Sequence, residues 1–164
     1  MIPFASLACL LLLAPQASVT GLLAPSVPAW QPPVVPVVVE RPFLAPAGPY
    51  SPGHRGVDLA AGPGQEVRAA GAGVVRLAGP VAGRPVVSIE HPQRILGLTG
   101  WRTTYDSVVP SVRVGERVRT GDIIGRLSPG SHTDGLHWGL RRDDRYADPL
   151  LLLRRPVVLK PLGH

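Results

Sequence analysis

Residues 64–79 read GQEVRAAGAGVVRLAG, and this stretch indicates the fold class more clearly than any other part of the chain. Small and β-branched residues alternate between glycines, which predicts two short strands joined by a tight turn. Further strands are predicted from RPVVSIEH (84–91), WRTTYDSVVP (101–110), VRVGERVRTGDIIGRL (112–127) and LHWGLRRD (136–143), and YADPLLLL (146–153) predicts a short closing segment. No stretch predicts a helix of three turns. We therefore expect an all-β domain, an antiparallel sheet or sandwich-like fold with short loops and little helix.

Composition supports this fold class and narrows the function. The chain has 164 residues, with 19 glycines, 20 prolines and a formal charge of +6, and Lys160 is its only lysine. That length suits one domain with tails. The arginines are scattered and form no basic block between aromatic residues, so we expect no nucleic-acid partner. We interpret the arginines as surface charge that keeps the chain soluble, and the alternative is binding to an anionic polymer such as a bacterial wall.

Four regions follow one another along the chain. We predict a signal peptide over 1–17, a proline-rich extended linker over 18–49, the folded domain over 50–153 and a C-terminal tail over 154–164. The mature protein is then expected to be secreted, without a membrane anchor. The single cysteine, Cys9, lies in the apolar leader. An intrachain disulfide and a cysteine-based metal cluster are therefore excluded, and any metal must be held by His, Asp or Glu.

Two stretches carry metal-binding residue types. HRGVD (54–58) places His54 and Asp58 four residues apart, with Gly56 between them, and GLHWGLR (135–141) carries His137. In a loop that enters a strand, the first spacing lets both side chains turn toward one point, and we expect Gly56 to ease the bend. Two imidazoles and a carboxylate form a ligand set that catalytic zinc sites use, with a further position left for water. By itself, the pair His54 and Asp58 also fits a hydrogen-bonded turn.

The order of these motifs resembles the lysostaphin-type (LytM-like) zinc peptidases. The resemblance rests on GHRGVDLAAGPGQEVRAAGAGVV, VVSIEH, TTYDSV, VRVGERVRTGDIIGRL and LHWGLRRDDRYADPLLLL, and it runs from about residue 50 to residue 153. It implies a β-rich fold with a groove over an antiparallel sheet. It also implies zinc held by His54, Asp58 and His137, and cleavage of peptide bonds in peptidoglycan.

Two positions depart from that family. The family usually has His-x-His where this chain has Gly135-Leu136-His137, and Tyr-x-His where it has Tyr105-Asp106-Ser107. Gly135 and Ser107 thus stand where two proton-handling histidines are expected. We predict His132, in the loop GSHTDG, as the catalytic residue that would replace them, and an exposed loop histidine is the alternative. We expect Asp106 to point away from the face shared by Tyr105 and Ser107, and we discount it for that reason.

The remaining candidates are assigned to structure. We expect His91 to have a structural role, Tyr105 and Trp101 to be packing residues, and Trp138 to lie in the core because it alternates with His137.

Three functions remain under consideration. The first is a secreted zinc metalloendopeptidase acting on cell-wall peptidoglycan peptides, with a degenerate catalytic shell. The second is a non-catalytic zinc-binding relative that binds peptidoglycan or regulates a wall hydrolase as its partner. The third is a lipoyl- or biotinyl-type carrier, because VRAAGAGVV (67–75) and residues 112–127 resemble the two halves of that motif. A carrier needs a lysine at a hairpin tip, and the position of Lys160 in the tail argues against it.

Overall fold

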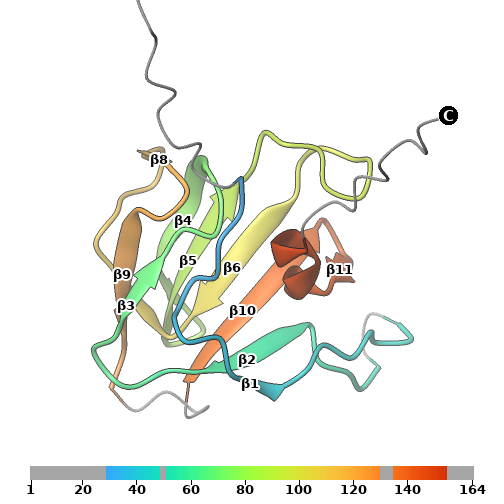
Figure 1. Ribbon diagram of the computed structural model, residues 1–164, viewed down its shortest axis with the longest axis horizontal. Coiled ribbons are helices and arrows are strands. Elements are labelled where there is room, and N and C mark those ends of the chain that lie inside the picture. The colour runs from blue at the N-terminus through green and yellow to red at the C-terminus, as the bar shows by residue number, and fades with distance from the viewer. Residues whose placement is uncertain (1–28, 49–50, 130–134, 155–164) are drawn as a thin grey trace, which may run out of the picture.

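The computed structural model describes residues 29–48, 51–129 and 135–154, and Figure 1 shows their arrangement. The predicted signal peptide over 1–17, His132 and nearly all of the predicted tail lie outside these residues. Within the described part of the chain, no helix has the length and apolar character that crossing a bilayer requires.

Two antiparallel sheets make up the described part of the protein. The larger has eight strands, in the order β1-β2-β10-β6-β5-β4-β8, and β11 pairs with β10. Its members are β1 (Val39–Arg41), β2 (Gly56–Ala60), β4 (Gly73–Val81), β5 (Arg84–Glu90), β6 (Arg102–Asp106), β8 (Arg117–Val118), β10 (Gly135–Arg142) and β11 (Arg145–Ala147). The smaller sheet has the order β3-β9-β7, with β3 (Glu66–Arg68), β7 (Val108–Pro110) and β9 (Ile123–Leu127).

The expected all-β fold is confirmed. Among the described residues the only helical element is the 3-10 turn η1 (Pro149–Leu153), which Figure 1 shows beside β10 and β11. Asp148 caps this turn by accepting a hydrogen bond from the Leu150 amide. The two strands predicted over 64–79 are β3 and β4, and they belong to different sheets.

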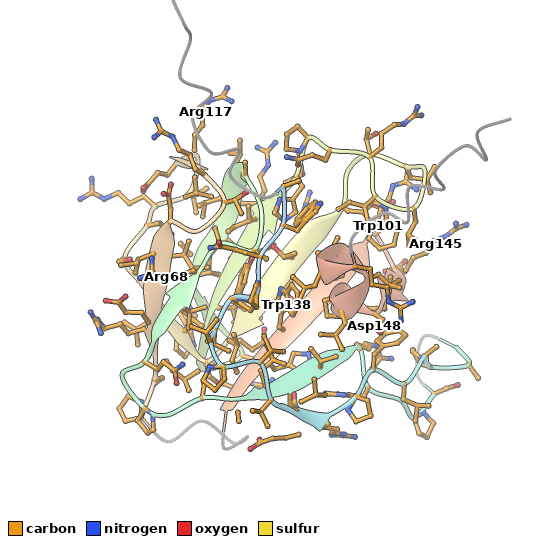
Figure 2. The ribbon with its side chains drawn as sticks, viewed as in Figure 1. Arg68, Trp101, Arg117, Trp138, Arg145 and Asp148 are labelled. Carbon is orange, nitrogen blue, oxygen red and sulfur yellow. The ribbon has the colours of Figure 1, made fainter. Side chains whose placement is uncertain are left out.

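The hydrophobic core is built from the inward faces of these strands. Trp138 of β10 and Tyr105 of β6 are paired neighbours in the large sheet and are completely buried. They belong to one core cluster with Val67 and Ile124 of the small sheet. Figure 2 shows Trp138 in the middle of the molecule, whereas Arg117 and Arg145 lie at its periphery. The predicted packing roles of Trp138, Tyr105 and Trp101 agree with this burial.

Ser107 ends β6 and separates it from β7. We expected one strand over 101–110, but Ser107 has a φ of 63°, in the left-handed region that ends regular pairing. The chain leaves the large sheet at this residue, and β7 then pairs with β9 in the small sheet. The strand expected from this stretch is therefore two strands in two sheets.

Residues 29–48, which we call the N-terminal arm, run along the domain. They are extended, as their prolines predict, but they also pack: β1 pairs with β2, and Val34 is only 3% exposed. Trp30 forms a bridge with Gly71 and meets the His91 ring edge-on, with 4.7 Å between ring centroids. The described part of the predicted linker is thus in contact with the folded domain.

Candidate metal centre

His54 is held in place just before β2 by the N-terminal arm. Its backbone exchanges two hydrogen bonds with Leu44, of 2.8 and 3.0 Å. Its ring Nδ1 donates to the carbonyl oxygen of Pro42 at 2.8 Å. Because a carbonyl can only accept, this bond places the proton of a neutral His54 on Nδ1 and leaves the lone pair on Nε2. His54 therefore presents a metal-ligating nitrogen to the interior of the site.

Asp58 and His137 bring the other two ligand atoms to the same point. They are direct partners in the pairing of β2 with β10, so their side chains lie on one face of the sheet. Asp58 Oδ1 is 2.7 Å from His137 Nδ1 and 3.1 Å from His54 Nε2, and the two nitrogens are 3.2 Å apart. The pairing register and the arm together gather the three predicted ligands, which we call the metal triad.

Gly56 allows the His137 ring to take this position. A Cβ at residue 56 would lie 2.8 Å from His137 Nε2 and 2.5 Å from the Trp138 carbonyl oxygen. Both distances are shorter than ordinary van der Waals contact, so only glycine fits against this ring. The sequence suggested that Gly56 eases a bend, and the structure gives close approach as the reason for a glycine.

The donor chemistry of the triad fits a divalent cation. With Nδ1 of His54 donating to Pro42, its Nε2 lone pair faces a carboxylate oxygen and a second imidazole nitrogen. Three acceptor atoms this close repel one another unless a proton or a cation lies among them. The triad is the one group of three or more His, Cys, Asp or Glu side chains that the described ranges place within 4.8 Å. Two imidazoles with one carboxylate suit zinc.

Two spaces border the triad and share part of their lining. A metal pocket of about 180 Å³ is lined by Arg41, His54, Asp58, Arg84, Asp106, Ser107 and His137. A longer groove of about 440 Å³ runs over β4, β5, β6 and β10, and its lining includes Arg76, Ser88, Arg102, Thr104, Asp106, His137 and Arg141. Asp106 and His137 line both spaces, so the groove reaches the metal pocket at these two residues.

Asp106 belongs to this site, which corrects our expectation. The alternation correctly separated Asp106 from Tyr105, but Ser107 does not share the face of Tyr105. Its left-handed turn breaks the alternation, and it lines the metal pocket together with Asp106. Tyr105, however, is the residue in the core, where its hydroxyl accepts from the Ala70 amide at 2.9 Å. Asp106 therefore faces the metal pocket. Burial raises the pKa of its carboxyl, while the charges of His137 and Arg84 lower it and Asp58 raises it further.

Ser107 and Gly135, the two positions that lack the expected histidines, differ in whether a larger side chain fits there. Ser107 lines the metal pocket, at the left-handed turn that ends β6. Gly135 pairs with Ala60 in β2, and a Cβ there would collide with the Leu59 carbonyl oxygen. A histidine does not fit at Gly135 on this backbone.

The other predicted residues fall outside the site or outside the described residues. His91 is buried behind the sheet, where Nδ1 donates to the Ala72 carbonyl at 2.9 Å and Nε2 is 2.8 Å from Thr103 Oγ1. Burial lowers the pKa of its imidazole, although the Ala72 bond and the Glu90 charge raise it. The predicted structural role of His91 agrees with this placement. His132 lies outside the described residues and stays a prediction.

Known proteins similar to this chain were found by sequence and by structure. The model of peptidase family M23 matches residues 52–149, which is more than half of the chain. An uncharacterized protein of Mycobacterium tuberculosis is 47% identical over 137 residues, which cover 78% of this chain. The match spans 53% of that protein, so the chain corresponds to about half the length of the curated relatives it matches.

Two solved structures share the fold. The SpoIIQ-SpoIIIAH pore-forming complex contains a chain that is 28% identical with a TM-score of 0.59, over 80% of this chain and 95% of that one. The catalytic domain of lysostaphin from Staphylococcus simulans is 22% identical with a TM-score of 0.58, over 72% of this chain and 93% of that one. At this identity the second comparison establishes the fold alone.

Proposed function

Because the chain belongs to peptidase family M23, we propose that it is a secreted zinc metalloendopeptidase that cleaves peptide bonds in bacterial cell-wall peptidoglycan. The observation that carries this proposal is the convergence of His54 Nε2, Asp58 Oδ1 and His137 Nδ1, which lie 2.7 to 3.2 Å apart. The predicted signal peptide supports export, and a peptidase of the wall must act outside the cytoplasm.

The metal triad would hold the zinc ion in this proposal. A bound zinc ion supplies Lewis acidity, which polarises a peptide carbonyl and makes water a nucleophile near neutral pH. In a neutral His54 ring, the bond to Pro42 leaves the Nε2 lone pair for binding, and hydrogen bonds of this kind also fix the orientation of a ligating ring. Asp58 contributes the negative charge of the ligand set.

The groove supports a peptide substrate that carries carboxylates. Its floor follows one face of the large sheet, and the cross-strand row Glu90, Arg102 and Arg141 lies at the end away from the triad. Arg76 and Arg102 share the single carboxylate of Glu90, so this end keeps a net positive charge. Peptidoglycan stem peptides have free carboxylates that such a groove would attract.

A second function is favoured by the two missing histidines. Gly135 and Ser107 leave the metal pocket without the imidazoles that the family pattern predicts. A non-catalytic relative that keeps zinc to bind peptidoglycan or to regulate a partner wall hydrolase would tolerate both changes. One structure of similar fold is described as part of a pore-forming complex, which supports a role in assembly for this scaffold.

One experiment separates the two functions. The purified chain is analysed for zinc by mass spectrometry and then incubated with peptidoglycan, and the released peptides are separated by chromatography. We expect about one zinc ion per chain, new peptide products, and loss of both in Asp58→Asn. Zinc without products would favour the non-catalytic relative, and a chain that takes up no zinc would refute both functions.

A further inference from the structure

Asp106 occupies a particular place in the large sheet. The pairings of β2 with β10 and of β10 with β6 set Asp58, His137 and Asp106 side by side in one cross-strand row. Directly paired residues present their side chains on the same face. The two carboxylates therefore flank His137 on the face that carries the metal pocket.

The His137 ring is turned toward β2. Its Nδ1 lies 2.7 Å from Asp58, and its Nε2 is at the β2 side of the ring, against Gly56. Asp106 is thus beside the triad without being held by it. Among the described residues, its carboxylate makes no hydrogen bond or ion pair, and it is not a member of the metal triad.

Position and charge together suit a proton acceptor. Asp106 lies where the metal pocket meets the groove, which is where a peptide bond in the groove would reach the triad. The charged or titratable groups that line the metal pocket with it are Arg41, His54, Asp58, Arg84 and His137. Within the described part of the metal pocket, it is the one carboxylate outside the triad.

We propose that Asp106 accepts the proton of the attacking water in this chain, in place of the histidines that Ser107 and Gly135 have replaced. This inference rests on the proposed function. The water oxygen adds to the peptide carbonyl carbon, and the proton it loses passes to Asp106. The same proton then moves to the amide nitrogen as the C–N bond breaks, which yields a carboxylic acid and an amine.

The test compares Asp106→Asn, which keeps the shape and removes the proton acceptor, with Asp122→Asn as a matched control. Asp122 is an exposed acid in the turn before β9, and its side chain accepts from the Arg119 amide, which asparagine can also do. We expect Asp106→Asn to retain zinc and to lose about a hundredfold or more in cleavage rate. Asp122→Asn should match wild type in zinc content and in cleavage rate.

A binding measurement makes the result independent of turnover. Acetohydroxamic acid is titrated into each zinc-loaded protein, because its acidic proton can be donated to a neighbouring carboxylate. We expect Asp106→Asn to weaken binding about tenfold, the loss of one charge-assisted hydrogen bond. If wild type cleaves nothing, the proposed function fails and the inference fails with it, and a loss of binding then shows only that Asp106 accepts a proton from a ligand in the metal pocket. If wild type cleaves and Asp106→Asn binds acetohydroxamic acid as tightly as wild type, the inference alone fails.

Three further outcomes overturn the inference. The first is an Asp106→Asn protein that cleaves like wild type, which would leave the proposed function intact. The second is a loss of zinc from Asp106→Asn, which would make Asp106 a ligand. The third is a rate that falls in His132→Ala and not in Asp106→Asn, which would assign the proton to His132.

Discussion

A single glycine shows how the backbone restricts the chemistry of this metal centre. Gly135 begins β10 so close to β2 that its Cα faces the Leu59 carbonyl oxygen, and no side chain fits between them. Ser107, by contrast, stands at a turn with a φ of 63°, a conformation that histidine tolerates better than β-branched residues do. The two departures from the family pattern are therefore not equivalent, and only Ser107 is at a position that could accept an imidazole.

Gly135→Ala should destabilise the domain. The added Cβ collides with the Leu59 carbonyl oxygen, and overpacking of this kind costs about 1 to 3 kcal/mol. The free energy of unfolding in urea measures the effect, and Gly62→Ala is the control, because a Cβ at Gly62 meets nothing within 4 Å. Equal stability of the two variants would contradict the close approach of β10 to β2.

At the scale of elements, buried polar contacts join the strands behind the metal face. His91 follows β5, contacts the Ala72 carbonyl just before β4, and meets Thr103 of β6. Thr103 Oγ1 in turn lies 2.9 Å from the Tyr105 hydroxyl, and burial raises the pKa of Tyr105 to about 12. Burial of the His91 ring favours its neutral form and lowers its pKa.

Stability should fall in acid partly because of His91. The pKa of His91 in the fold lies below its ordinary value of 6.5. Below pH 6.5 the unfolded chain therefore binds a proton at this residue more readily than the folded chain does. The contribution of His91 to the free energy of unfolding is therefore fully present above pH 6.5. It decreases as the pH falls, by up to about 1.4 kcal/mol per pH unit. Urea unfolding of the zinc-free protein at about pH 7.5 and about pH 5 should show a smaller loss in His91→Gln than in wild type. Equal losses in the two proteins would show that His91 does not contribute.

At the scale of the whole molecule, the N-terminal arm is part of the metal centre. The Pro42 carbonyl oxygen accepts a hydrogen bond from His54 Nδ1. Arg41 lies opposite Asp58 in the pairing of β1 with β2 and lines the metal pocket. Trp30 and Val34 fix the other end of the arm against the domain. The arm therefore connects domain stability with the orientation of a metal ligand.

A chain that begins at residue 49 should bind zinc more weakly than one that begins at residue 29. Loss of the partner of a ligating histidine typically lowers metal affinity about 10- to 100-fold. Competition with a chromogenic chelator measures the affinity, and thermal unfolding measures the stability. Trp30→Ala is the companion variant: it should lower the melting temperature and leave zinc affinity near that of the chain from 29. If truncation leaves zinc affinity unchanged, Pro42 does not orient His54.

Much of this molecule follows from local patterns in the chain. The glycines, prolines and alternating branched residues predicted an all-β fold, because strand formation and turns depend mainly on neighbouring residues. The motif HRGVD and His137 also predicted the three side chains that the structure brings together. Alternation along a strand assigned Trp138 and His137 to opposite faces, and it separated Asp106 from Tyr105 correctly.

Contacts between segments far apart in sequence determined the features of the fold and the site that local patterns did not predict. Alternation defines two faces but does not say which one meets the core, so the side of the sheet on which Asp106 lies depended on packing between the two sheets. The chain leaves the large sheet at Ser107, and the arm docks through Pro42, for a similar reason. Each depends on pairing between segments far apart in sequence, and nearby residues carry no information about such a partner.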